Sequence, residues 1–317
     1  MDFTNLPSHF IEFRKAVLHE SSNEVLSLST EYIVTKYKQL DKLEAASRFC
    51  SYTLLDAART EGDNFLKLGF FPWVEASQDF DKALSLIMLT CYKNSFDSLR
   101  RSLELIAIGS FYADDETEAK NARAWIKSKK DTPNFKRVLE KLVKEYPYSL
   151  CEKQLGLMDF LLSLYYRLSD FIHVKGINKS HRKFTPSFHY LNGVSEFVFN
   201  ENSCKESLDI YLETVEAVAL LCALCNPTLL IGLDLERKFG LSTPISGFLE
   251  EHQSERLRFL IPKKFVPFID ELMQQDENIK STNEWFESLP DISEEELKQQ
   301  CEAMDNLIKR GQPFSNE

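Results

Sequence analysis

Glycine and proline are scarce in this chain, with 10 and 11 residues respectively among 317. β-Sandwiches and barrels need turn residues between many short strands, so this shortage argues against both architectures. Hydrophobic residues make up 43% of the sequence and charged residues 27%, which is ordinary globular usage with enough apolar material for a sizeable core. These proportions predict an all-α protein, a bundle of long helices.

The sequence also lacks a long hydrophobic run. Its longest, residues 217–225, is too short to span a bilayer, so we expect a buried helix end and no membrane association. The N-terminus has no basic segment followed by an apolar run, and we therefore expect no signal peptide and a cytoplasmic location.

Neither a cofactor motif nor a metal-binding pattern is present. There is no glycine-rich phosphate loop, esterase elbow or zinc-protease helix motif. The seven cysteines have no repeating spacing, and Cys222 and Cys225 form a C-x-x-C pair without a second pair or a following histidine at zinc-like spacing. We interpret the cysteines as reduced, mostly buried thiols, and predict no cofactor and no metal.

Positive charge is in deficit, because the net charge is −11 at pH 7. Proteins that hold nucleic acid usually present a basic surface, so any RNA contact here would need a local basic patch. One small cluster qualifies, formed by Lys175, Lys179 and Arg182. The alternative interpretation of this cluster is an ordinary solvated loop.

Helical periodicity and turn signals predict the order of the elements. We expect helices at 10–20, 31–60, 75–112, 119–128, 133–146, 152–172 and 203–226, with a serine-rich connection at 21–30 and a turn at 69–73. Residues 181–200 are rich in aromatics without helical period, which predicts a short hairpin or an ordered loop. We place a domain boundary near 232, with a helical bundle at 1–232 and a helical C-terminal extension at 233–317 that ends in an acidic helix capped by Ser293.

Two of these predicted helices carry polar residues at helical spacing among many apolar ones. The first stripe is Asn94, Asp97, Arg101 and Glu104, and the second is Asp159, Ser163, Arg167 and Asp170, with Ser169 beside it. Buried charges must be paired, so we predict that the two helices are adjacent and that the stripes face each other or a partner subunit. The alternative is a closed structural network of ion pairs within each helix.

The segments SFDSLRRSLELIAIGSFY (95–112) and LYYRLSDFIHVKG (164–176) resemble the paired helices of HEPN domains from uncharacterised bacterial proteins. The similarity covers about residues 75–227. It implies an all-α bundle that forms a homodimer, and a role in bacterial stress or antiviral (phage) defence. Active members of the family are metal-independent endoribonucleases with an arginine followed a few residues later by a histidine.

In this sequence the corresponding pair is Arg167 and His173, with five residues between them. A histidine can move protons near neutral pH, and an arginine can stabilise charge developing on phosphate, as attack by a 2′-hydroxyl requires. Leu168 stands where active members carry a polar residue. A second interpretation is therefore a catalytically silent helical interaction or scaffold protein, which binds a protein partner through its acidic C-terminal region.

Overall fold

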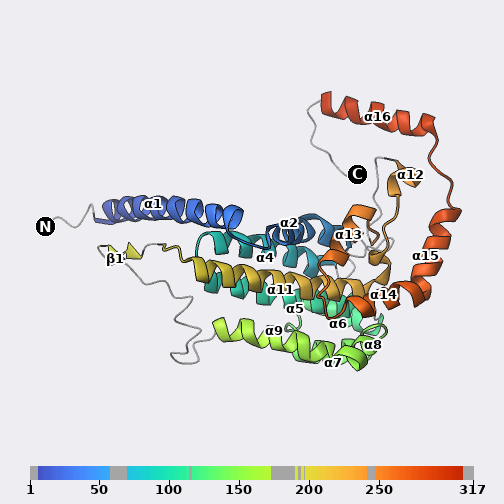
Figure 1. Ribbon diagram of the computed structural model, residues 1–317, viewed down its shortest axis with the longest axis horizontal. Coiled ribbons are helices and arrows are strands. Elements are labelled where there is room, and N and C mark those ends of the chain that lie inside the picture. The colour runs from blue at the N-terminus through green and yellow to red at the C-terminus, as the bar shows by residue number, and fades with distance from the viewer. Residues whose placement is uncertain are drawn as a thin grey trace.

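The computed structural model describes residues 6–57, 70–113, 116–172, 190–191, 194–195, 197–240 and 247–309. Helices account for most of these residues, and the all-α prediction is confirmed (Figure 1). The only strands within these ranges are β1 (Tyr190–Leu191) and β2 (Val194–Ser195), which pair antiparallel. They fall inside the segment 181–200, where the aromatic composition predicted a hairpin or an ordered loop.

The helices form a bundle followed by a smaller helical region. The bundle consists of α1 (Leu6–Thr35), α2 (Leu40–Arg48), the π-helical η2 (Phe49–Thr53), α3 (Leu54–Ala57), α4 (Phe70–Met88), α5 (Tyr92–Ala113), α6 (Glu116–Ile126), α7 (Phe135–Leu142), α8 (Tyr148–Leu155), α9 (Leu157–Ile172), α11 (Glu201–Cys225) and the 3₁₀ helix η3 (Pro227–Leu230). The region after it consists of α12 (Leu235–Phe239), α13 (Glu251–Phe259), α14 (Val266–Gln275), α15 (Glu277–Ser288) and α16 (Glu294–Lys309).

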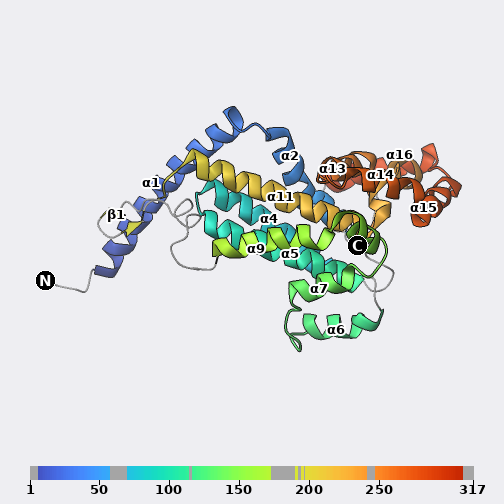
Figure 2. The same cartoon turned by 60° about the horizontal axis from the view of Figure 1, so that its bottom comes forward.

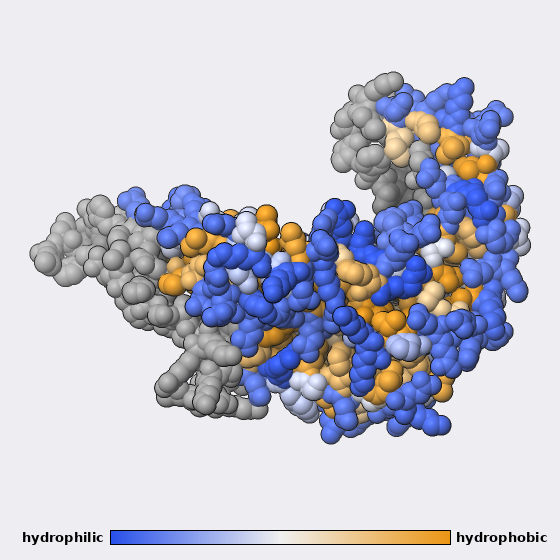
Figure 3. All heavy atoms as spheres, in the orientation of Figure 1, coloured by the Kyte–Doolittle hydropathy of each residue, from blue (hydrophilic) through white to orange (hydrophobic). Residues whose placement is uncertain are grey.

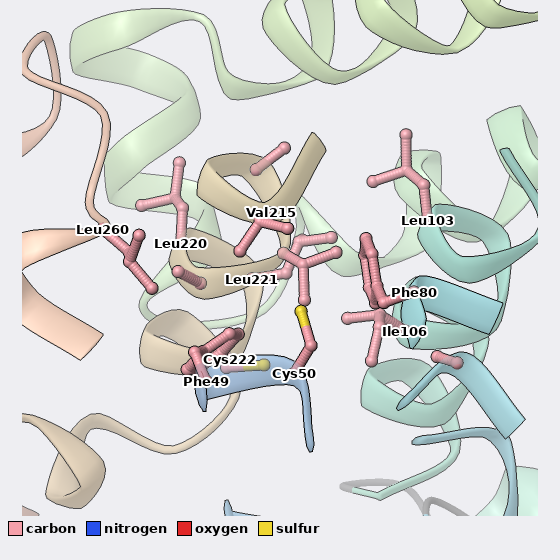
Figure 4. Close-up of a cluster of buried hydrophobic side chains, with 14 of the residues drawn as sticks. Phe49, Cys50, Phe80, Leu103, Ile106, Val215, Leu220, Leu221, Cys222 and Leu260 are labelled. Carbon is pink, nitrogen blue, oxygen red and sulfur yellow. The ribbon is translucent and has the colours of Figure 1, made fainter. Parts of the chain in front are cut away.

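Two helices, α5 and α11, form the centre of the bundle. They pack against each other and against α4, and α9 lies on α5. Every residue of 217–225 is buried, as expected for the longest apolar run of the sequence. Figure 4 shows Leu221 and Cys222 of this run opposite Phe80 and Ile106, with Cys50 of η2 between them. Among the described residues, no helix is long and apolar enough to cross a membrane.

The long helix predicted at 75–112 is two helices. After Met88 the chain turns at Thr90, whose φ is +59°, and α5 returns along α4 as a helical hairpin. A threonine in this left-handed conformation is uncommon, and neither glycine nor proline marks the turn. The prediction of one continuous helix was therefore wrong.

The prediction of a serine-rich connection at 21–30 was also wrong, because α1 continues through these residues without a break. Serine and threonine hydroxyls can compete with the backbone hydrogen bonds of a helix, but in α1 they donate to backbone carbonyls while the helix continues. The Thr30 hydroxyl donates to the Leu26 carbonyl at 2.7 Å. Ser29 is buried and donates to the carbonyl of Met88 at 2.8 Å, which joins α1 to the end of α4. The N-terminal part of α1 projects beyond the bundle (Figure 1).

Further boundaries also differ from the predicted ones. Residues 70–73 of the turn predicted at 69–73 belong to α4, and the helix predicted at 31–60 is interrupted at 36–39, between α1 and α2. The helix predicted at 152–172 is divided at Gly156, which has a φ of +64° and ends α8 before α9 begins. The helix expected to begin at 203, with Ser203 as its N-cap, begins at Glu201. Its N-cap is Asn200, whose side chain accepts from the Ser203 amide at 2.9 Å. Asparagine and serine are comparable N-caps, so composition alone does not distinguish them.

The C-terminal region is attached to the bundle through α13 and α14. Leu257, Leu260 and Phe265 belong to the same buried cluster as the bundle core. At the connection a side chain on Gly232 would place its Cβ 2.3 Å from the Cα of Glu251, so only glycine fits there. A domain boundary near 232 stays a prediction.

Beyond this connection a second, smaller cluster forms. It contains Leu233, Leu235 and Phe286, and it holds α12 against α15. The predicted cap of the last helix is confirmed, because Ser293 and Glu296 form a reciprocal capping pair at the start of α16. Hydrophilic residues predominate over α15 and α16 on the face seen in Figure 3.

Candidate functional site

The predicted arginine of the site lies on the outer face of α9. The Arg167 side chain is 42% exposed, and Asp159, Ser163 and Asp170 are exposed on the same helix. The predicted partner His173 follows the last residue of α9 directly and lies outside the described residues. The predicted RNA contacts Lys175, Lys179 and Arg182 also lie outside them.

Arg167 pairs with a carboxylate of the neighbouring helix α11. Its guanidinium donates to Glu213, whose side chain is 37% exposed. The pair therefore joins α9 to α11 near the surface, where water screens the attraction. The alternative pairing of Arg167 with Asp170, expected from their spacing within one helix, is not among the ion pairs of the described residues.

The corresponding arginine of α5 has a different partner. Arg101 donates from two nitrogens to both carboxylate oxygens of Asp79 on α4. The Asp79 side chain is only 3% exposed, whereas that of Arg101 is 55% exposed. The neighbouring stripe residues Asn94 and Asp97 are exposed. Arg101 therefore neutralises a buried carboxylate from the solvent side, and its hydrogen bond to Asp79 raises its own pKa.

The two polar stripes are not buried between the helices. The helices α5 and α9 do pack together, as predicted. Apart from the half-buried Glu104, however, the stripe residues are exposed, and their two arginines pair with α4 and α11. For the first stripe, the expectation of burial assumed one continuous helix at 75–112, in which apolar residues such as Ala83 and Ile87 share an arc with the polar ones. These residues belong to α4, and the turn at Thr90 separates them from the polar arc of α5.

A polar contact between α5 and α9 does exist, and it involves Glu104 of the first stripe together with Arg100, which lies outside the stripe. Arg100 donates to the Tyr165 hydroxyl at 2.8 Å and to Glu104 at 3.3 Å, and its guanidinium lies 4.9 Å from the centre of the Tyr165 ring. The ring of Phe135 on α7 stacks on the ring of Tyr165, with centroids 4.6 Å apart. Burial, and then the charge of Glu104, raise the pKa of Tyr165.

Of this group, only Glu104 was predicted from the sequence. Arg100 and Glu104 are four residues apart on one helix, a spacing that can be recognised in the sequence, whereas the contribution of Tyr165 depends on tertiary packing. Ser169, which we expected to join the polar network around the site, is buried, and its hydroxyl donates to the carbonyl of Tyr165 at 2.8 Å. Ser169 is thus satisfied within α9.

The thiols behave as predicted. All seven cysteines are free, and five of them are buried, including Cys222 and Cys225. Burial raises the pKa of Cys222 well above its ordinary value, so this thiol stays protonated at neutral pH. Within the ranges that the structure describes, no three histidine, cysteine or acidic side chains are grouped so that they could hold a metal ion.

Comparisons with models of protein families, with curated proteins and with solved structures find no match to this chain. The resemblance of residues 95–112 and 164–176 to HEPN helices is therefore carried by these residues alone.

Proposed function

We propose that the outer face of α9 and the residues after it form an RNA-cleaving or RNA-binding site, in a HEPN-like module of bacterial stress or phage-defence type. In this proposal Arg167 binds phosphate and His173 transfers protons, without a metal. The observation that supports it is the exposure of Arg167. At 42% exposed, its guanidinium is accessible to a phosphate group, as the proposed role requires.

Electrostatics sets a condition on this proposal. Glu213 already pairs with Arg167, and Asp170 lies three positions further along α9. A phosphate must therefore replace the Glu213 carboxylate on the guanidinium. Because both partners are partly exposed, the exchange costs little, about 1 kcal/mol or less. The chain as a whole is acidic, so the attraction that brings RNA to this face has to come from Lys175, Lys179 and Arg182.

The direct test is an RNA cleavage and binding assay on purified full-length protein. We expect the wild type to cleave mixed RNA equally with and without a chelator, and His173→Ala and Arg167→Ala to lose cleavage while their circular dichroism stays helical. Arg48→Ala is the matched control, because Arg48 also forms an exposed ion pair, with Glu44 on α2. Cleavage unchanged in the His173 variant would refute the proposed site.

A second candidate function is a catalytically silent interaction protein, and the Arg167–Glu213 pair supports it. This pair joins two helices of the bundle, as a structural ion pair does. In that case neither Arg167→Ala nor His173→Ala alters RNA binding, and the partner is a protein bound through the acidic C-terminal helices.

For either function we also propose a cytoplasmic homodimer. Sedimentation equilibrium of the full-length protein tests the dimer, and a mass equal to one chain, 36.8 kDa, at micromolar concentration would refute it.

A further inference from the structure

A pocket of about 620 Å³ opens where α8 begins and α11 ends. The last turn of α9 lies towards the other end of the bundle (Figure 1). Cys225 on the pocket wall lies twelve positions after Glu213, the partner of Arg167, which corresponds to about 18 Å along α11. The pocket is therefore distinct from the face proposed to bind RNA, and a ligand could occupy it whether or not the chain acts on RNA.

The inner wall of the pocket is apolar or already hydrogen-bonded. It includes Cys225 and Pro227, both buried, and Ser110, whose hydroxyl donates to the Ile106 carbonyl at 2.8 Å. The ring of Phe111 contributes an aromatic surface. A ligand that enters this part gains by burying apolar or aromatic surface rather than by forming hydrogen bonds.

A hydrogen-bonded tyrosine forms another side. The hydroxyl of Tyr146 donates to Asp276 at 2.7 Å, and the other oxygen of Asp276 accepts from the amides of Asn278 and Ile279. This interaction holds the tyrosine ring at the pocket, and the charge of Asp276 contributes to raising the pKa of Tyr146 to about 12, after burial. Asp276 thus occupies the amides of the second and third residues of α15, and these amides do not serve a ligand.

The rim is cationic. Lys141 and Lys144 line it and are exposed, and the single acidic residue of the lining is Glu145. The Lys141 ammonium lies 4.6 Å from the centre of the Phe111 ring, which places a positive charge directly beside the aromatic wall. Two ammonium groups at one edge of the pocket favour an anion there, although the chain has a net charge of −11, because the nearby carboxylate of Asp276 is already hydrogen-bonded to Tyr146 and to amides of α15.

We propose that this pocket binds a small aromatic molecule that carries one anionic group. The ring lies against Phe111 and Tyr146, and the anion lies between Lys141 and Lys144. Pockets of this volume suit ligands of nucleotide or drug size. A nucleoside monophosphate and an aromatic carboxylate share this chemistry, and the experiment distinguishes them.

The test is isothermal titration calorimetry of the full-length protein with four probes. These are adenosine 5′-monophosphate, salicylate, adenosine and inorganic phosphate. We expect at least one of the two aromatic anions to bind about tenfold more tightly than adenosine or phosphate. Adenosine lacks the anionic group, and phosphate lacks the aromatic ring. Binding of the nucleotide alone identifies a phosphate-bearing ligand, and binding of salicylate identifies a carboxylate. No binding by either aromatic anion, or phosphate binding as tightly as the nucleotide, would overturn the proposal.

Substitutions test whether the ligand binds in this pocket. Lys141→Ala and Lys144→Ala should each weaken it about tenfold, as expected for the loss of one charge-assisted contact. Lys136→Ala is the matched control, because Lys136 is exposed on the same helix α7 and does not line the pocket. Equal weakening by Lys136→Ala would show a nonspecific charge effect and refute the site.

The cysteines offer an independent measurement. Bound ligand should slow modification of the Cys225 thiol by a maleimide, followed by mass spectrometry, because this residue is 7% exposed at the pocket wall. Cys301 on α16 is exposed and should react at the same rate with and without ligand. Protection of both, or of neither, under conditions where calorimetry shows binding would place the ligand elsewhere.

Discussion

Arg101 on α5 and Arg167 on α9 occupy equivalent places in two similar helices, yet their partners differ. Each lies in a stripe of exposed polar residues and reaches across to an acid on the next helix. The acid that pairs with Arg101 is Asp79, which is 3% exposed, whereas the acid that pairs with Arg167 is Glu213, which is 37% exposed. The difference between the two pairs therefore lies in the solvation of the carboxylate.

This difference distinguishes an arginine that is required for stability from one whose guanidinium can bind a ligand. A buried carboxylate that loses its cation is left as an unpaired charge in the protein interior, and this strongly lowers the free energy of unfolding. A half-exposed carboxylate that loses its cation is solvated by water, which costs little. Arg101 is thus committed to the fold, whereas Arg167 can exchange its partner for a ligand without destabilising the bundle.

The largest expected effect is that of removing Arg101. Breaking a fully buried ion pair costs about 3–5 kcal/mol, and the exposed end of Arg101 reduces this to about 2–3 kcal/mol for Arg101→Ala. Urea denaturation followed by circular dichroism measures the change in the free energy of unfolding. Adding Asp79→Asn to Arg101→Ala should restore part of the loss, because the unpaired charge is then gone. A loss no larger than that of Arg167→Ala would remove the distinction between the two arginines.

A smaller effect is expected where α5 and α9 actually share a polar contact. Tyr165→Phe removes the hydroxyl that accepts from Arg100, and should lower the free energy of unfolding by about 1–2 kcal/mol. The ring remains, so the stacking on Phe135 is kept. Tyr166→Phe is the control, because Tyr166 is the adjacent residue and is 51% exposed. Equal losses in the two variants would show that the Arg100 contact contributes nothing.

The same tyrosine predicts a pH dependence in the alkaline range. The pKa of Tyr165 is raised above its ordinary value of 10.0, first by burial and then by Glu104. Above pH 10 the unfolded chain releases this proton while the folded protein keeps it, so the stabilisation is complete below pH 10 and is lost as pH rises through the folded pKa. Tyr165→Phe should therefore lose less stability than wild type between pH 9 and about pH 11, measured by urea denaturation at each pH. Identical pH profiles would contradict the assignment.

The overall architecture could be predicted from composition and periodicity, and the polar surfaces could not. Scarce glycine and proline, and the apolar run at 217–225, were sufficient for an all-α fold with a buried α11. Neither glycine nor proline marks the turn at Thr90, so the helix predicted at 75–112 combined residues of α4 with residues of α5. That error turned a solvated face into an apparently buried one.

Sequence spacing indicated that α5 and α9 are adjacent, but it did not indicate the partners of their arginines. Arg101 and Arg167 were expected to pair within their helices or with each other's stripe, but Asp79 and Glu213 are far from them in sequence. Only a tertiary arrangement brings such residues together. By contrast, the pair of Arg100 and Glu104 can be recognised from the sequence, because the two residues are four positions apart on one helix.

The smallest effect on stability is expected for the Arg167–Glu213 pair. Its two variants should nevertheless differ clearly in RNA binding. Arg167→Ala and Glu213→Gln should each change the free energy of unfolding by about 1 kcal/mol or less, because both side chains are partly exposed. Their effects on RNA should be opposite. Loss of Arg167 removes the cation that is proposed to bind phosphate, whereas Glu213→Gln leaves this cation and removes the carboxylate that pairs with it. We expect RNA binding, measured by fluorescence anisotropy at fixed salt, to weaken in the first variant and to strengthen severalfold in the second. If the pair is only structural, both variants will show the same slight destabilisation and unchanged RNA binding, and the interaction-protein function would then be favoured.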